Sequence, residues 1–200
     1  MNIRVPYGMS VHDHEEINAI IKTLNTSTQM GVNVKLFEKK IRKLFLKKFG
    51  LMTNSGTSAL FLAIESLSLP ANSEVITPVL TFATTISCLV KNNLVPVFTD
   101  VKKSNYCIDE DKIEKLITKR TKALCIPNLI GNLPNWNKIR NISKKYGLIV
   151  IEDSADTLAA TFKKKSTGFF SDISTTSFYG SHIINCAGNG GMVCFNDSKN

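Results

Sequence analysis

From Leu51 onward, short apolar runs alternate with segments whose apolar residues recur at helical spacing. Runs of this length predict strands, and the stretches between them are long enough for helices. The alternation is typical of a mostly parallel sheet covered by helices, because parallel neighbours need a long crossover connection. We therefore expect a single α/β domain. The expected strands lie near Val75–Thr77, Val95–Phe98, Lys122–Ile126 and Leu148–Glu152.

The first 50 residues follow a different pattern. Apolar residues at helical spacing within Ile17–Leu24 and again within Leu36–Phe45 predict two amphipathic helices before any strand. We expect residues 1–50 to form an N-terminal helical arm and residues 51–200 to form the large domain. Because the chain stops at Asn200, soon after an expected strand that ends at Phe195 and with no closing helix, we expect the chain to be truncated.

Two helix boundaries can be predicted from single residues. Asp109 is expected to cap the helix that carries Ile113, Leu116 and Ile117, since its carboxylate can accept a free backbone N–H at the helix start. Gly147 is expected to end the preceding helical pattern, which begins near Trp136.

The composition narrows the classes of function. The longest apolar stretches are far shorter than the ~20 residues of a membrane-spanning helix, and no secretory signal is visible, so we expect a cytoplasmic protein. The net charge of +9 comes from scattered basic residues. It favours a solvated surface over a nucleic-acid site and is compatible with an anionic substrate. Five cysteines without a CxxC pair indicate reduced thiols and no structural metal site.

Two segments place polar groups where ligands are often bound. Asn54–Ser58 follows an expected strand and opens an apolar helix, whose free N–H groups attract phosphate; a plain N-cap is the alternative. Ile149–Asp153 is an apolar strand that ends in two carboxylates. Ligands of open α/β sheets gather at such strand ends, so Asp153 is a candidate site residue; the alternative is that it caps a turn.

Five segments in fixed order, NSGTSAL, TPVLTFATT, IEDSADTLAA, STTSFYGSH and GNGGMV, resemble the DegT/DnrJ/EryC1/StrS family of sugar aminotransferases and dehydratases. The resemblance runs from Pro6 to Asp197. It implies the large domain of the pyridoxal-phosphate-dependent transferase fold type I, with the C-terminal small domain missing, and a homodimer when the chain is full length. It also implies a nucleotide-linked keto-sugar substrate and a role in deoxysugar or lipopolysaccharide biosynthesis.

The resemblance assigns several residues to the cofactor, pyridoxal phosphate or pyridoxamine phosphate. Gly56 and Thr57 would hold its phosphate, and Ser177 would add a hydroxyl to the same group. Phe82 would stack on the pyridine ring. Asp153 would pair with the ring nitrogen and keep it protonated, which preserves the ring's capacity to accept electrons.

His182 departs from the pattern of most relatives, which carry a lysine there. An imidazole cannot hold pyridoxal phosphate covalently as that amine does. Histidine is similar to the sugar 3-dehydratase branch, which uses pyridoxamine phosphate, and Asn128–Asn132 and the Asp153–Asp156 segment resemble that branch. Asp156, where aminotransferases usually have glutamine, is a further candidate cofactor contact. The resemblance therefore implies 3-dehydration of an NDP-4-keto-6-deoxyhexose, with His182 as the catalytic acid and base.

Other readings stay open. The chain could be an aminotransferase that uses a displaced lysine, the nearest being Lys163–Lys165, or an inactive truncated fragment. Ala155 stands where iron–sulfur dehydratases of the group carry a cluster cysteine, which disfavours that type. The three glycines within Gly188–Gly191 are expected to form a tight turn into a strand at Met192–Phe195, since glycine tolerates positive φ; direct contact with a ligand is the alternative.

Overall fold

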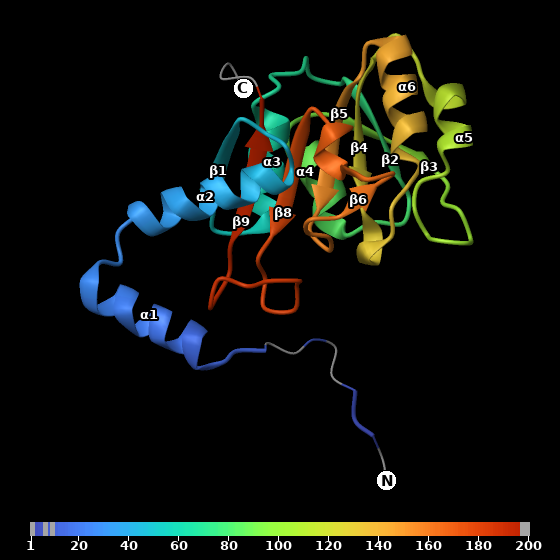
Figure 1. Ribbon diagram of the computed structural model, residues 1–200. Helices are drawn as coiled ribbons and strands as arrows, with labels where there is room; N and C mark the ends of the chain where they lie inside the picture. Colours follow the sequence, from blue (N-terminus) through green and yellow to red (C-terminus); the bar gives the residue numbers. More distant parts are fainter. Residues whose placement is uncertain (1–2, 6–7, 9–10, 197–200) are drawn as a thin grey trace.

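The computed structural model describes residues 3–5, 8 and 11–196 (Figure 1). Pro6, Tyr7 and Asp197, which bound the family resemblance, lie outside the described residues. The helices are α1 (His14–Thr26), α2 (Val32–Leu44), α3 (Gly56–Glu65), α4 (Ala83–Lys91), α5 (Glu110–Ile113) and α6 (Trp136–Tyr146). The strands are β1 (Phe49–Thr53), β2 (Glu74–Pro78), β3 (Val95–Thr99), β4 (Thr121–Pro127), β5 (Ile149–Ser154), β6 (Thr161–Phe162), β7 (Lys165–Ser166), β8 (Ile173–Ser177) and β9 (Gly191–Phe195).

One sheet of seven strands organises the domain, in the order β1-β9-β8-β5-β4-β2-β3. The strands from β8 to β3 run parallel, whereas β9 pairs antiparallel with both β1 and β8. The four strands predicted from the sequence are all present, and the expected mostly parallel sheet is confirmed. Because the parallel strands point the same way, their carboxyl ends meet at a single edge of the sheet.

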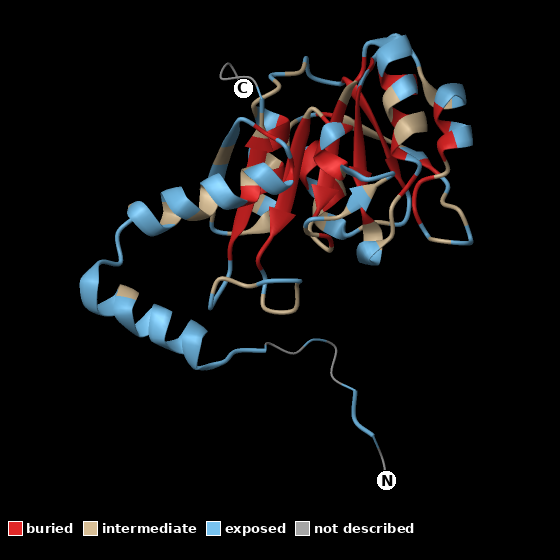
Figure 2. Cartoon of the chain, viewed as in Figure 1, coloured by how far each residue is buried: buried red, intermediate tan, exposed pale blue. Residues whose placement is uncertain are grey.

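Helices cover both faces of this sheet (Figures 1 and 2). On one face, α3 and α4 bury Ala63 and Leu89 in a cluster that includes Cys125 of β4. On the other face, α6 buries Trp136 in a cluster that includes Leu124, the preceding residue of the same strand. Successive strand side chains point to opposite faces, so each buried strand supplies two cores. This explains why the strands read as continuous apolar runs.

Both predicted helix boundaries are confirmed, but the length of one of the two helices is not. Gly147 ends α6 in a left-handed conformation, φ 65°, as expected of a C-terminal glycine. Asp109 caps α5 through the backbone N–H of Asp111 at 3.2 Å, also as expected. The helix was predicted too long, because it ends at Ile113 and continues only as a 3-10 turn, Glu114–Leu116. Ile117 lies beyond it in extended backbone.

The two N-terminal helices differ in how they pack. α1 contains no buried residue and projects away from the body in Figure 1, although it carries an apolar stripe at helical spacing. α2 packs beside β1 and buries Ile41 together with Phe45, the residue that follows the helix. Strand β1 begins at Phe49 and so crosses the predicted boundary at residue 50. The division into an arm and a large domain stays a prediction.

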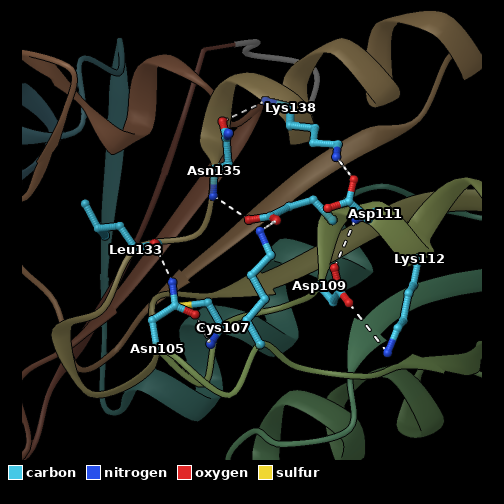
Figure 3. A network of polar contacts seen from close by, with 10 residues as sticks. Asn105, Cys107, Asp109, Asp111, Lys112, Leu133, Asn135 and Lys138 are labelled. Carbon is cyan, nitrogen blue, oxygen red and sulfur yellow. Dashed lines mark hydrogen bonds and ion pairs between the residues drawn. The ribbon is translucent and has the colours of Figure 1, made fainter.

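A polar network joins α5 to the start of α6 (Figure 3). Asp109, Glu110 and Asp111 bring their carboxylate oxygens within 4.8 Å of one another. Each carboxylate has a lysine partner, and the three partners are Lys112, Lys102 and Lys138. Glu110 also accepts the backbone N–H of Asn135, which caps α6. The network therefore ties two helix starts together and neutralises the three carboxylates.

A small hairpin, β6–β7, lies outside the main sheet. Its turn consists of Lys163 and Lys164, with φ 49° and 66°. Two residues with positive φ between paired strands match the type I′ turn, which prefers Asn-Gly. Lysine at both positions places two Cβ atoms in the left-handed region, so the turn carries local backbone strain.

Candidate active site

Asp153 lies at the carboxyl end of β5, beside Pro127 of β4 and Thr175 of β8 in the sheet register. Its Oδ2 accepts a hydrogen bond from the Thr85 hydroxyl at 3.0 Å, and its Oδ1 accepts the backbone N–H of Ala155 at 3.2 Å. Burial raises the pKa of the Asp153 carboxyl, and these two hydrogen bonds oppose the rise. The residue is therefore both a turn cap and a buried acid that is poised to meet a cationic partner.

Glu152, the other carboxylate of the same strand, has a different environment. It is fully buried and accepts hydrogen bonds from Asn128, Ser154, Ser171 and Ser174 at 2.7–3.0 Å. Neighbouring strand residues point to opposite faces, so one carboxylate serves the interior network while Asp153 meets α4. Strand alternation, which the sequence shows, predicts that the two carboxylates point to opposite faces of the sheet. It does not predict which partners each carboxylate meets.

The start of α3 lies against the end of β8. A Cβ built on Gly56 would be 2.6 Å from the Cβ of Ser177 and 2.9 Å from its Oγ, so only glycine allows this approach. Ser55 caps the helix by accepting the N–H of Ser58 at 3.1 Å. The fold thus brings Gly56, the neighbour of Thr57, against Ser177, so that a helix start lies beside a hydroxyl, the arrangement that suits a phosphate.

Phe82 is the N-cap residue of α4, three residues before Thr85, and its side chain is 71% exposed. The backbone N–H of Thr85 bonds to the Phe82 carbonyl at 3.0 Å, so the ring and the Asp153 partner belong to the same helix start. A large aromatic side chain left exposed at this edge of the sheet is available to cover a ligand.

His182 lies in the connection between β8 and β9, residues 178–190. Its Nε2 is 3.8 Å from Oδ1 of Asp156, which follows β5. The ring also packs edge-on against Tyr179, with centroids 5.8 Å apart. Asp156 adds to the rise in the pKa of Asp153 through charge repulsion, which connects the His182 pair to that buried acid.

The glycines at and before the start of β9 do not have the backbone conformation on which their prediction rested. None of them has a positive φ among the described residues; Ala187 adopts it instead, with φ 56°. Gly191 is needed for close approach, since a Cβ there would lie 2.2 Å from the Ser55 carbonyl oxygen and 2.6 Å from the Gly56 nitrogen. The reason given for the expected turn, a positive φ at glycine, was therefore wrong, and the constraint on Gly191 comes from packing against the α3 start.

Sequence reasoning gave no individual role to two polar residues beside the site, although both lie in segments that carry the family resemblance. Thr85 stands two residues into the helix that TPVLTFATT opens, and its burial could not be read from the motif. Asn128, which is buried, donates to Glu152 and accepts the Trp136 Nε1–H at 3.1 Å. Both residues act through contacts with segments distant in the chain, and the sequence alone does not show which partners they meet.

These features define the class of the protein. A mostly parallel α/β sheet carries an acid at the end of β5, a helix start against a hydroxyl at the end of β8, and an exposed aromatic ring at the next helix. This is the large-domain architecture of the fold type I pyridoxal-phosphate-dependent transferases. The chain belongs to the DegT/DnrJ/EryC1/StrS aminotransferase family, whose model matches residues 10–200.

The relatives include enzymes of two reaction types. The chain is 34% identical to a dTDP-4-dehydro-2,6-dideoxy-D-glucose 3-dehydratase of Saccharopolyspora spinosa, over 94% of this chain and 42% of that protein. It is 32% identical to a GDP-perosamine synthase of Caulobacter vibrioides, over 92% of this chain and 50% of that protein. The chain therefore spans about half the length of these curated relatives.

A solved structure of a dehydratase is also similar to this chain over almost its whole length. The solved structure of Escherichia coli GDP-4-keto-6-deoxy-D-mannose-3-dehydratase with bound hydrated PLP matches with a TM-score of 0.91 and 31% identity, over 98% of this chain and 52% of that one. In the part of the chain that the structure describes, no helix is long and apolar enough to cross a membrane.

Proposed function

We propose that this chain belongs to a vitamin B6-dependent enzyme that removes the 3-hydroxyl of a nucleotide-linked 4-keto-6-deoxysugar. The observation that carries the choice of reaction is His182, in a family whose members usually have lysine there. The 3-dehydratases among its relatives support the same reading.

The residues fit the cofactor's chemistry. A phosphate suits the helix start at Gly56 and Thr57 with the Ser177 hydroxyl beside it, and that approach requires glycine. A protonated pyridine nitrogen suits Asp153, because burial makes the free carboxylate costly and a cation would relieve that cost. Phe82 is exposed and free to cover the ring. When bound, pyridoxamine phosphate would supply the amine that condenses with the keto-sugar and the ring that accepts electrons.

The chain's own residues have distinct tasks in this proposal. Asp153 holds the ring nitrogen and keeps its proton in place. His182 moves a proton: it accepts one during the reaction and returns it to the departing 3-hydroxyl, which leaves as water. An imidazole suits both steps, because its unperturbed titration lies near neutral pH.

His182→Asn tests this role. In the full gene product, we expect His182→Asn to lose dehydration activity by about 10²–10⁴-fold, the usual contribution of a positioned acid–base group. The affinity for pyridoxamine phosphate should change little. Activity would be followed as loss of the 3-hydroxyl by mass spectrometry of the sugar nucleotide. Full activity of the variant would exclude His182 as the acid and base.

The second candidate function is transamination, which the GDP-perosamine synthase relatives favour. It requires a lysine that holds pyridoxal phosphate covalently. Lys163 and Lys165 lie in the β6–β7 hairpin, where their amines rest over the rings of Phe162 and Phe169. Borohydride reduction followed by peptide mass analysis decides between the functions. An adduct on any lysine would support transamination, and reversible binding without an adduct would support dehydration.

The nucleotide-linked substrate and the assembly also belong to this proposal. We expect the full-length enzyme to form a homodimer and to act in deoxysugar or lipopolysaccharide biosynthesis, as the name of a lipopolysaccharide biosynthesis relative from Salmonella typhimurium suggests. Light scattering of the full gene product would test the assembly.

A further inference from the structure

His182 and Asp156 form a pair whose two side chains come from different connections. Oδ1 of Asp156 lies 3.8 Å from Nε2 of His182, within ion-pair range and about 0.8 Å beyond an ordinary hydrogen bond. Hydrogen bonds of catalytic groups are often long before a ligand binds and shorten afterwards. The other ring nitrogen, Nδ1, is buried and has no hydrogen-bond partner among the described residues.

The second oxygen of Asp156 is already occupied. Oδ2 accepts the backbone N–H of Ile130 at 3.1 Å. Ile130 lies in the Leu129–Gly131 turn with φ 55°, so its N–H is directed by a turn and not by a freely rotating side chain. A backbone N–H can only donate, which means that the atom facing Ile130 must always be an acceptor. Oδ1 is therefore the atom left for His182.

The imidazole is also oriented from its own side. The backbone N–H of His182 donates to the Tyr179 carbonyl at 2.9 Å, which closes a short turn. The Tyr179 ring then meets the imidazole edge-on, at an interplanar angle of 67°. These contacts limit how far the imidazole can rotate away from Asp156.

We propose that Asp156 is a positioning residue that holds His182 in the Nε2–H tautomer and leaves Nδ1 without a proton. The tautomer follows from the contacts of Asp156 and does not rest on the proposed function. Only the expected effect of the tautomer on dehydration rests on it.

The geometry makes Asp156→Asn a sharp test. The Ile130 N–H requires an oxygen, so the amide of asparagine must keep its oxygen there and turn its NH₂ group toward His182. That group donates to Nε2, which must then be the unprotonated nitrogen. The variant should therefore invert the tautomer to Nδ1–H. Asp156→Glu keeps the carboxylate and should retain the original tautomer, while Asp111→Asn controls for the loss of one negative charge far from the pair.

The measurement is ¹⁵N NMR of the full gene product labelled at histidine, because the two ring nitrogens differ in shift according to which carries the proton. The His182 signals are assigned by their loss in His182→Gln. The inference expects Nε2–H in the wild type, in Asp156→Glu and in Asp111→Asn, and Nδ1–H in Asp156→Asn. An unchanged tautomer in Asp156→Asn would overturn it, whatever reaction the enzyme catalyses.

Kinetics give a second readout. Asp156→Asn should lower kcat for dehydration on the order of 10²-fold or more. KM for the sugar nucleotide and Kd for pyridoxamine phosphate should stay within about threefold. A rise in the cofactor Kd with an unchanged tautomer would assign Asp156 to the cofactor and overturn the inference. An inverted tautomer in a protein without dehydration activity would support the pair and remove the proposed function alone.

Discussion

The Thr85 hydroxyl donates a hydrogen bond to Oδ2 of Asp153 at 3.0 Å and so connects the first turn of α4 to the end of β5. Thr85 in turn accepts a hydrogen bond from the Thr81 hydroxyl at 2.9 Å, which fixes the direction of its own proton. Both Thr85 and Asp153 are buried. The carboxylate that we assign to the cofactor ring is thus aligned before any ligand arrives.

Thr85→Val should weaken cofactor binding. Valine has the shape of threonine but cannot donate to Asp153, so the carboxylate loses a partner that opposes the rise in its pKa. We expect the Kd of pyridoxamine phosphate to rise roughly tenfold, which corresponds to about 1.4 kcal/mol. An absorbance titration of the full gene product measures this. Thr84→Val, on the same helix, is the matched control, and an equal effect there would refute a specific role for Thr85.

Gly191→Ala should destabilise the fold, because the new methyl group would lie 2.2 Å from the Ser55 carbonyl oxygen. The carbonyl oxygen belongs to the backbone and the methyl group is bonded directly to it, so no side chain can turn aside and the backbone must move. We expect a loss of about 1–3 kcal/mol in the free energy of unfolding. Gly188→Ala is the control, since nothing lies within 4 Å of its added Cβ. Urea denaturation compares the two, and similar midpoints would contradict the close approach.

Replacing Lys163-Lys164 by Asn-Gly should stabilise the protein. Both lysines hold positive φ in the β6–β7 turn, and Asn-Gly adopts this turn without the same steric cost. We expect a gain on the order of 1 kcal/mol in the free energy of unfolding. The substitution also removes two of the three lysines considered for transamination. Retained lysine labelling after borohydride in this variant would point to another lysine.

Stability should fall at alkaline pH through Cys194. Burial raises the pKa of its thiol to about 12 from the ordinary value of 9.0. Between these values the unfolded chain releases a proton that the folded chain keeps, so the thiol's contribution is complete below pH 9.0 and is lost toward pH 12. Between the two pKa values, the free energy of unfolding falls by about 1.4 kcal/mol per pH unit.

Cys194→Ala tests that contribution. The difference in unfolding free energy between wild type and variant should be constant from about pH 7 to 8.5 and should shrink at higher pH. Urea denaturation at several pH values measures this difference. A difference that stays constant up to about pH 10.5 would show that the thiol ionises equally in both states.

The strands of this domain could be predicted because each supplies both faces of a core, which leaves a run of apolar residues in the sequence. Glu152 and Asp153 show where that reasoning ends. They are neighbours in one motif, yet one is surrounded by buried hydroxyl and amide donors and the other bonds to Thr85. Which partner each finds depends on the register of distant strands and helices, and this information is not local.

Gly147 and Gly191 also show that a local constraint can be predicted from the sequence and a distant one cannot. Gly147 was predicted because its constraint is local, a left-handed residue at a helix end. Gly191 was assigned the wrong reason because its constraint is the distance to Ser55, more than a hundred residues earlier in the chain. A resemblance to a family named the candidate site residues, but only the packed chain shows that Gly56 and Ser177 lie against each other.

His182 lies in the connection between two anchored strands and not within one. An exchange at this position leaves both cores of the sheet untouched, whereas an exchange at Asp153 or Gly56 disturbs buried contacts. In evolutionary terms, the group that we propose as the acid and base is separable from the scaffold. Descendants of one ancestral fold could acquire a different chemistry here through a single codon change, without first acquiring a new way to fold.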